Sequence, residues 1–155
     1  MKLEIERKFL LKTPLPDLVN GKTIIQSYIF VSERKAMRVR IVDNICQINI
    51  KISKDELTRD EFEYEIPMSE GLKLIELGCT HSPIEKLRYL VNYENMVWEI
   101  DIFKGENEGL VIAEIELESA TQHFIKPPWI GEEVTYDKRY HNPYLYEIPY
   151  KTWKY

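Results

Sequence analysis

Glu4-Ile5-Glu6-Arg7-Lys8 is the stretch that decides the fold of this chain. Alternate side chains of a β-strand share a face, so a strand over residues 2–11 places two carboxylates and one ammonium group on the same side. Glu4 and Glu6 would lie about 7 Å apart and repel by roughly 2 kcal/mol at an effective dielectric of about 20. A divalent cation would turn this repulsion into attraction. The stretch therefore predicts a strand with one charged face suited to a metal ion.

Composition limits the classes of function. The chain has 155 residues, of which 44% are hydrophobic and 30% charged, and its formal net charge is −5. This is typical of a folded protein, and we expect one domain over residues 1–155. A chain without a basic field is not expected to bind nucleic acid, and no apolar run is long enough for a membrane helix. Two cysteines and no signal-peptide pattern predict a cytoplasmic protein.

Alternation with period two dominates the chain and predicts a mainly β fold with a few helices. Tight turns are expected at Asp43-Asn44 and Glu94-Asn95. Short helices are expected over residues 69–78, after an N-cap at Ser69, at the capping-box pattern Ser119-x-x-Gln122, and over residues 136–147. Short turns between strands favour an antiparallel sandwich or barrel. The expected strands are 2–11, 23–32, 36–43, 45–53, 59–66, 85–93, 96–103 and 110–118.

Charged side chains share one parity in seven of these eight strands. The simplest explanation is a sheet with one wet, polar face. However, the charges are segregated, because some strands carry only acids on this parity and others only bases. Thr and Ser, which a solvated face usually contains, are sparse there. The charged residues on this parity are Glu4, Glu6, Lys8, Arg38, Arg40, Lys51, Glu61, Glu63, Glu65, Lys86, Arg88, Glu99, Asp101, Glu114, Glu116 and Glu118.

The alternative is a closed barrel whose charged face lines the interior, with the apolar face outside under the helices and the aromatic C-terminal tail. Buried charges persist when they are paired or bind a metal. Clustered bases suit phosphate groups, and clustered carboxylates suit Mg²⁺ or Mn²⁺. Such a lumen would suit a metal-bound polyphosphate.

The ordered set of motifs resembles the CYTH superfamily, the triphosphate tunnel metalloenzymes. The resemblance covers nearly the whole chain and begins with Glu4-x-Glu6-x-Lys8. It implies an eight-stranded antiparallel β-barrel that forms a charged tunnel, with short helices outside and at the C-terminus. It also implies hydrolysis or cyclisation of triphosphate substrates with Mg²⁺ or Mn²⁺. The other motifs are Gln26-x-Tyr28, Arg38-Val-Arg40, Lys51, Arg59-x-Glu61-x-Glu63, Glu85-Lys86-x-Arg88-Tyr89, Glu99-x-Asp101-x-Phe103, Glu114-Ile-Glu116, Gly131-Glu-Glu-Val-Thr135 and Asp137-Lys138-Arg139-Tyr140.

The resemblance also implies roles for individual residues. Asp101 is expected to bind a second metal or to position the attacking water. Lys8, Lys51, Asp101 and Glu63 are the catalytic candidates. The metal candidates are Glu4, Glu6, Asp101, Glu114 and Glu116, and the candidates for phosphate binding are Lys8, Arg38, Arg40, Lys51, Lys86, Arg88 and Lys138.

Three functional readings stay open at this point. The compact bacterial members of the family favour a metal-dependent hydrolase of inorganic tripolyphosphate. A second reading is a class IV-type adenylyl cyclase that makes cyclic AMP from ATP, or a thiamine or nucleoside triphosphatase. A third is a polyphosphate-binding module without catalysis. A small triphosphate-containing molecule is the expected partner in each case, and an exposed outer sheet face would allow a homodimer.

Overall fold

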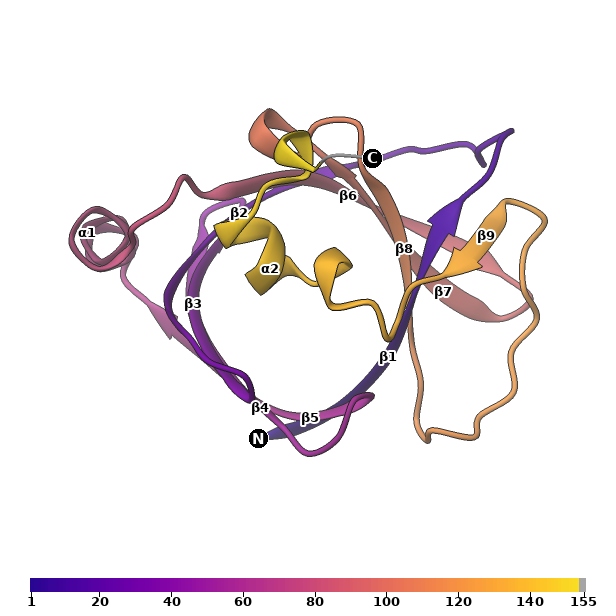
Figure 1. The fold of residues 1–155 in the computed structure, drawn as a ribbon, viewed down its shortest axis with the longest axis horizontal. Helices are drawn as coiled ribbons and strands as arrows, with labels where there is room; N and C mark the ends of the chain where they lie inside the picture. The colour runs from indigo at the N-terminus through magenta and orange to yellow at the C-terminus, as the bar shows by residue number, and fades with distance from the viewer. Residues whose placement is uncertain (154–155) are drawn as a thin grey trace.

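The computed structural model describes residues 1–153, and an antiparallel sheet in it closes on itself into a barrel (Figure 1). The sheet order is β5-β4-β3-β2-β6-β7-β8-β1-β9, and β5 also pairs with β1. Eight strands therefore form a closed barrel, as expected, and β9 is an additional edge strand. The bounds are β1 Lys2–Leu11, β2 Lys22–Val31, β3 Lys35–Val42, β4 Ile45–Ser53, β5 Thr58–Ile66, β6 Ile84–Tyr93, β7 Met96–Phe103, β8 Val111–Glu116 and β9 Ile130–Glu133.

The alternation of the strands separates a charged interior from an apolar exterior. On β1, Lys8 faces inward and contacts Glu114 of β8, whereas Phe9 faces outward into an apolar cluster. The turn at Glu94 and Asn95 holds both residues at positive φ, of 48° and 62°, which suits the twist of a two-residue hairpin. The period-two pattern therefore sets which face of each strand closes around the lumen.

A cover of aromatic side chains protects the outer face of β1, β7 and β8. Trp98 is fully buried there, with its ring 5.6 Å from that of Phe9 and 5.7 Å from that of Trp129. Trp129 and Phe124 come from the segment between β8 and β9, which runs outside the ring in Figure 1. These aromatic residues stabilise the barrel from outside.

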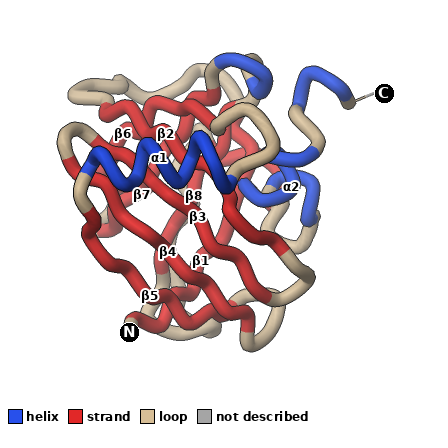
Figure 2. The backbone as a smooth tube through the Cα atoms, turned by 90° about the vertical axis from the view of Figure 1, so that its left-hand side faces the viewer, coloured by secondary structure: helices blue, strands red, loops and turns tan. Residues whose placement is uncertain are grey.

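Helix α1, Met68–Gly78, covers another part of the exterior and crosses the strands on the face shown in Figure 2. It packs closely because Gly71 has no side chain: a Cβ there would lie 2.1 Å from Sγ of Cys46 on β4. The helix was predicted, but its expected N-cap was wrong. Pro67 occupies the cap position without a side-chain cap, and Ser69 lies inside the helix.

The helix expected after Ser119 is absent, since residues 117–129, all of them described, contain a bend, two short turns and irregular chain. The side chain of Gln122 accepts a hydrogen bond from the backbone of Glu118 at 2.6 Å, which closes a single turn. Phe124 then packs against Phe9 and Trp98. This packing holds the segment in an irregular conformation against the outside of the barrel, so the helix indicated by the local capping pattern does not form. The strand β9 that follows was not predicted.

The C-terminal segment closes part of one mouth of the barrel. The single helix expected over residues 136–147 is divided into a 3₁₀ turn, Lys138–Tyr140, and α2, Asn142–Glu147, with Pro143 at the start of α2. Both lie within the outline of the ring in Figure 1. Leu145 and Tyr146 pack on an apolar cluster at this end of the barrel, formed by Tyr28, Ile84, Phe103, Leu110 and Ile112. The tail was expected to cover the exterior, and it instead covers an apolar end of the interior.

Among residues 1–153, no helix has the length and apolar character needed to cross a membrane.

Candidate active site

Two connected cavities occupy the barrel. An inner cavity of about 200 Å³ is lined by eight basic and seven acidic side chains, and a mouth cavity of about 640 Å³ opens beside α2. The mouth cavity extends to the β2–β3 and β4–β5 loops. Eight residues line both cavities and form the passage between them: Glu6, Lys8, Tyr28, Arg38, Lys51, Arg59, His141 and Pro143.

Lys8 is the centre of the corner between β1 and β8. Its Nζ lies 2.8 Å from Glu114 and 3.5 Å from Glu6, and all three side chains are largely buried. Burial alone would lower the pKa of Lys8, but Glu114 and Glu6 raise it to about 12. Burial raises the pKa of Glu114, yet Lys8 and Arg88 hold it well below its usual range. These groups are therefore charged at neutral pH.

A second cluster joins β1, β4 and β5. Lys51 Nζ lies 3.0 Å from both Glu4 and Glu61, and Arg59 bridges Glu4 and Glu6 at 3.1 and 2.7 Å. Burial, with Arg38 and Arg59 nearby, lowers the pKa of Lys51 to about 8. Glu4 is shared between Lys51 and Arg59, and Glu6 between Arg59 and Lys8, so the cluster holds its charges without a ligand.

Asp101 anchors the bases of β6. Its two oxygens accept hydrogen bonds from Nε and Nη2 of Arg88 at 2.7 and 2.8 Å, and Nζ of Lys86 lies 2.8 Å away. Arg88 also pairs with Glu99. Burial lowers the pKa of Lys86 to about 7. Asp101 raises this pKa, whereas the positive charges of Arg88 and Arg40 lower it further. Asp101 itself is fully buried and lines neither cavity.

Arg38 and Arg40 differ from the other bases because neutral amides hold them. Arg38 Nε donates to Asn49 Oδ1 at 2.9 Å, and Arg40 Nε donates to Gln26 Oε1 at 2.9 Å. Within residues 1–153, neither guanidinium has a carboxylate within 4.0 Å. Burial, then Arg38 and Arg88, lower the pKa of Arg40 to about 9. The lumen thus contains two positive charges that lack a paired acid.

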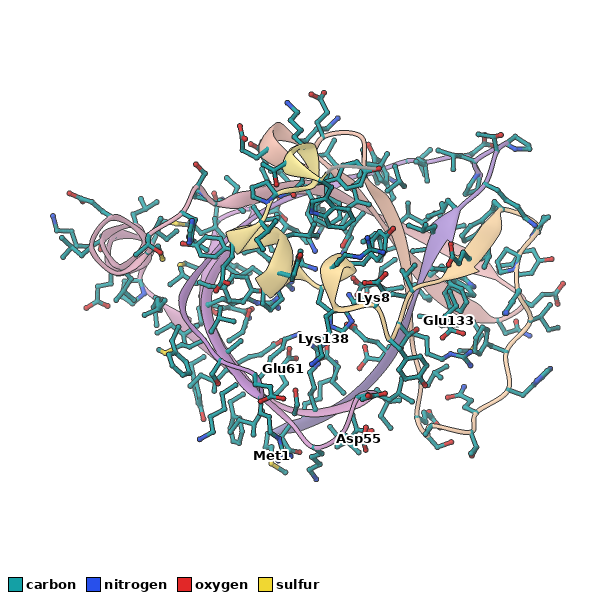
Figure 3. The ribbon with its side chains drawn as sticks, in the orientation of Figure 1. Met1, Lys8, Asp55, Glu61, Glu133 and Lys138 are labelled. Atoms are coloured by element: carbon teal, nitrogen blue, oxygen red, sulfur yellow. The ribbon has the colours of Figure 1, made fainter. Side chains whose placement is uncertain are left out.

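The structure brings most of the predicted site residues together, and Figure 3 shows Lys8 and Glu61 within the ring. Lys138 is exposed and lines only the mouth cavity. Glu63 and Glu116 line the inner cavity where β5 and β8 end, and both are exposed. The hydrogen bond between Glu63 and Glu61 raises the pKa of Glu63. The residues at the centre of the inner cavity are Glu4, Glu6, Lys8, Arg38, Arg40, Lys51, Lys86, Arg88 and Glu114.

Several residues of the site had no predicted role. Arg59 shares the inward parity of Glu61 and binds two glutamates, so its place on the strand was a usable signal. Gln26 and Asn49 also have this parity, but their role as acceptors depends on neighbouring strands. Asn142 lies beyond the barrel strands, and no local pattern indicated that it reaches the lumen.

The inward carboxylates fit a hard divalent cation in their chemistry. Glu6 lies opposite Glu116 in the β1–β8 register, and Glu99 lies opposite Glu114 in the β7–β8 register. Like charges in such positions repel, and burial together with Glu114 raises the pKa of Glu99. Oxygen ligands of this kind suit Mg²⁺ or Mn²⁺. As the side chains stand in residues 1–153, no three acidic, His or Cys groups converge as a ready metal centre, since bases occupy the carboxylates.

Residues 2–143 match the CYTH domain, which covers the whole barrel and the passage between the two cavities. The chain belongs to the CYTH family. Two relatives of this family are named inorganic triphosphatase. One, from Acetivibrio thermocellus, is 45% identical over 152 residues, 97% of each chain. The other, from Nitrosomonas europaea, is 34% identical over 146 residues, 92% of this chain and 95% of the relative.

Solved structures share the CYTH barrel. The crystal structure of an inorganic triphosphatase superposes with a TM-score of 0.67 at 32% identity and covers 94% of this chain and 95% of that one. A conserved hypothetical protein of Pyrococcus furiosus has a TM-score of 0.58 at 22% identity over 76% of this chain and 80% of that one. The second similarity concerns the fold alone.

Proposed function

We propose that this CYTH protein hydrolyses inorganic tripolyphosphate inside the barrel with the help of Mg²⁺ or Mn²⁺. The observation that carries the proposal is the pair formed by Arg38, which is buried, and Arg40, which is half-buried: two positive charges in the lumen without a paired acid among residues 1–153. A buried charge that lacks a partner is costly, so the pair favours an anion. Arginine also offers the forked donors that phosphate oxygens accept. The two relatives named inorganic triphosphatase support the same substrate.

The bases of the lumen would bind and orient the substrate. Arg38 and Arg40 would contact phosphate oxygens first, since binding there breaks no ion pair. The paired bases would bind next, by exchanging their carboxylate partners for phosphate oxygens; these are Lys8, Lys51, Lys86 and Arg88. Lys138 at the mouth would contact the part of the substrate that lies nearest to solvent. Phosphoryl transfer needs little covalent chemistry from a protein, so this positioning and charge neutralisation would supply most of the catalysis.

The exchange of partners would free the acids for a metal ion. Glu4, Glu6, Glu114 and Glu116 would hold it, because they are the inward carboxylates of β1 and β8. When bound, the ion would supply a Lewis acid that offsets charge on the phosphate oxygens. We assign Asp101 to holding Lys86 and Arg88 rather than to a metal, because both of its oxygens are already engaged in a fully buried position.

Hydrolysis forms one bond to phosphorus and breaks another. A water oxygen bonds to the terminal phosphorus, the bond from that phosphorus to the bridging oxygen breaks, and pyrophosphate and orthophosphate are released with one proton. We propose that Glu63 accepts this proton, because its raised pKa makes it a better base than an ordinary glutamate. Lys8, with its pKa of about 12, would stay protonated and neutralise the leaving pyrophosphate.

A comparison of substrates tests the proposal. The value of kcat/KM would be measured with Mg²⁺ for tripolyphosphate, pyrophosphate, ATP and thiamine triphosphate, with cyclic AMP assayed in parallel. Tripolyphosphate should be the preferred substrate, and ATP should yield no cyclic AMP. Production of cyclic AMP with little orthophosphate would replace the proposal by a cyclase. Tight binding of tripolyphosphate without turnover would replace it by a binding module.

A further inference from the structure

Asn142 is the residue through which the C-terminal segment reaches the bases of the lumen. It begins α2, and its side chain is buried inside the barrel. Its Oδ1 accepts one hydrogen bond from Lys86 Nζ at 3.0 Å and another from Gln26 Nε2 at 2.8 Å. A single oxygen atom therefore connects the C-terminal segment with β6 and β2.

The chemistry of the neighbours fixes the orientation of this carboxamide. Asp101 favours the ammonium form of Lys86, which is only a donor, so the oxygen of Asn142, and not its nitrogen, faces this form. Gln26 donates a hydrogen bond from Nε2 to Asn142. Its Oε1 therefore points the other way and accepts a hydrogen bond from Arg40 Nε at 2.9 Å. Gln26 is fully buried, so both ends of its side chain are held by these two contacts. The orientation of Arg40 thus depends on Asn142 through one intervening amide.

A neutral acceptor suits this position better than a charged one. Lys86 already has Asp101 at 2.8 Å, and Arg40 has no acid within 4.0 Å in the described chain. A further carboxylate would neutralise positive charge that the phosphate needs and would repel the phosphate itself. An amide oxygen orients both bases and leaves their charge available.

We propose that Asn142 is a positioning residue for the triphosphate, holding Lys86 directly and Arg40 through Gln26 in the directions from which they contact phosphate. The inference rests on the proposed function of the lumen and extends it to a residue outside the barrel strands. The C-terminal segment is then part of the substrate site as well as part of the wall of the barrel.

The test uses the full chain and four variants. Binding of inorganic tripolyphosphate is measured by calorimetry in EDTA, and KM and kcat are measured with Mg²⁺. The variants are Asn142→Ala, Asn142→Asp, the double variant Gln26→Ala with Asn142→Ala, and Asn107→Ala as the control. Asn107 is equally buried, and its Oδ1 accepts from the backbone of Tyr150 at 2.8 Å, but it lines neither cavity.

Asn142→Ala should weaken tripolyphosphate binding and raise KM by about 10- to 100-fold, while kcat stays within about threefold. Asn142→Asp keeps an acceptor for Lys86 and therefore keeps the fold, but its added charge should also weaken binding by at least about tenfold. The double variant should lose less than the product of the single losses, because both residues act on Arg40. Asn107→Ala should lower the thermal midpoint and leave binding and KM unchanged.

Wild-type affinity in both Asn142 variants would overturn the inference, and so would an equal loss of affinity in Asn107→Ala. If Asn142→Ala does not fold, wild-type affinity in Asn142→Asp overturns the inference by itself. Failure of the proposed function looks different: the wild-type chain would bind tripolyphosphate without cleaving it, and the binding measurements would still test Asn142. Turnover by the wild-type chain with unaffected Asn142 variants would refute the inference alone.

Discussion

Lys8 of β1 and Glu114 of β8 lie opposite each other on adjacent strands and face the lumen, with Nζ 2.8 Å from Oε1 and both side chains almost fully buried. Each group keeps the other charged, so the pair is stable without a ligand. The same arrangement would separate when a metal-bound triphosphate enters, because the phosphate attracts the lysine and the metal attracts the glutamate. Pairing of acids and bases would therefore keep the lumen folded and ready for both parts of the substrate.

Arg40→Ala should reduce kcat/KM for tripolyphosphate by about one to two decades. The change removes a charge-assisted contact worth roughly 1.5–3 kcal/mol and breaks no ion pair. Steady-state kinetics with Mg²⁺ measures the loss. Arg139→Ala is the matched control, since Arg139 pairs with Asp137 on the surface and lines neither cavity. Equal effects of the two changes would contradict the role given to Arg40.

Glu6→Gln should be more damaging, with a loss of about two to three decades in kcat, as for an electrostatic stabiliser of the transition state. The reason is that it removes one carboxylate from the proposed metal site and one of the two acidic partners of Arg59. The concentration of Mg²⁺ needed for half-maximal rate should rise as well. Glu65 of β5 shares the parity of Glu61 and Glu63 but lines neither cavity, so Glu65→Gln should behave as wild type. An unchanged metal requirement in Glu6→Gln would remove Glu6 from the metal site.

Asp101→Asn should act mainly on stability. It leaves the buried charges of Lys86 and Arg88 without their acid, and breaking such a pair typically costs about 3–5 kcal/mol. Urea unfolding measures the difference, with Asp137→Asn as the control, since Asp137 is only partly buried and its partner Arg139 lies at the surface. A variant that keeps wild-type stability and binding but has no turnover would return Asp101 to a direct role in the chemistry.

The affinity for tripolyphosphate in EDTA should fall as the pH rises above about 7. Burial lowers the pKa of Lys86 to about 7 in the free protein. A bound anion favours the ammonium and raises this pKa, so binding above pH 7 must take up a proton. The expected loss is up to about tenfold per pH unit. Calorimetry at pH 8 in buffers of different ionisation enthalpy should detect this uptake, and Lys86→Met should show less of it, the remainder coming from Lys51, whose pKa burial lowers to about 8. Identical uptake in both proteins would contradict the titration of Lys86.

The barrel was predictable from the sequence because a parity pattern is local. The alternation of Glu4, Glu6 and Lys8 predicts one charged face, and the repetition of this pattern over further strands indicates a closed interior. The segment after Ser119 was not predictable in this way, because the packing of Phe124 against Trp98 is long-range and overrides a capping signal. The role of Asn142 was not predictable for the same reason, since its hydrogen-bond partners lie on β2 and β6, far away in the sequence. A homodimer and a cytoplasmic location stay predictions.

The most direct test follows tripolyphosphate by phosphorus NMR with the wild-type chain, first with Mg²⁺ and then after addition of EDTA. The account predicts equal amounts of pyrophosphate and orthophosphate with Mg²⁺, and arrest of the reaction by EDTA. Unchanged tripolyphosphate with Mg²⁺ or Mn²⁺, or cleavage that continues in EDTA at the same rate, would contradict metal-dependent hydrolysis in this lumen.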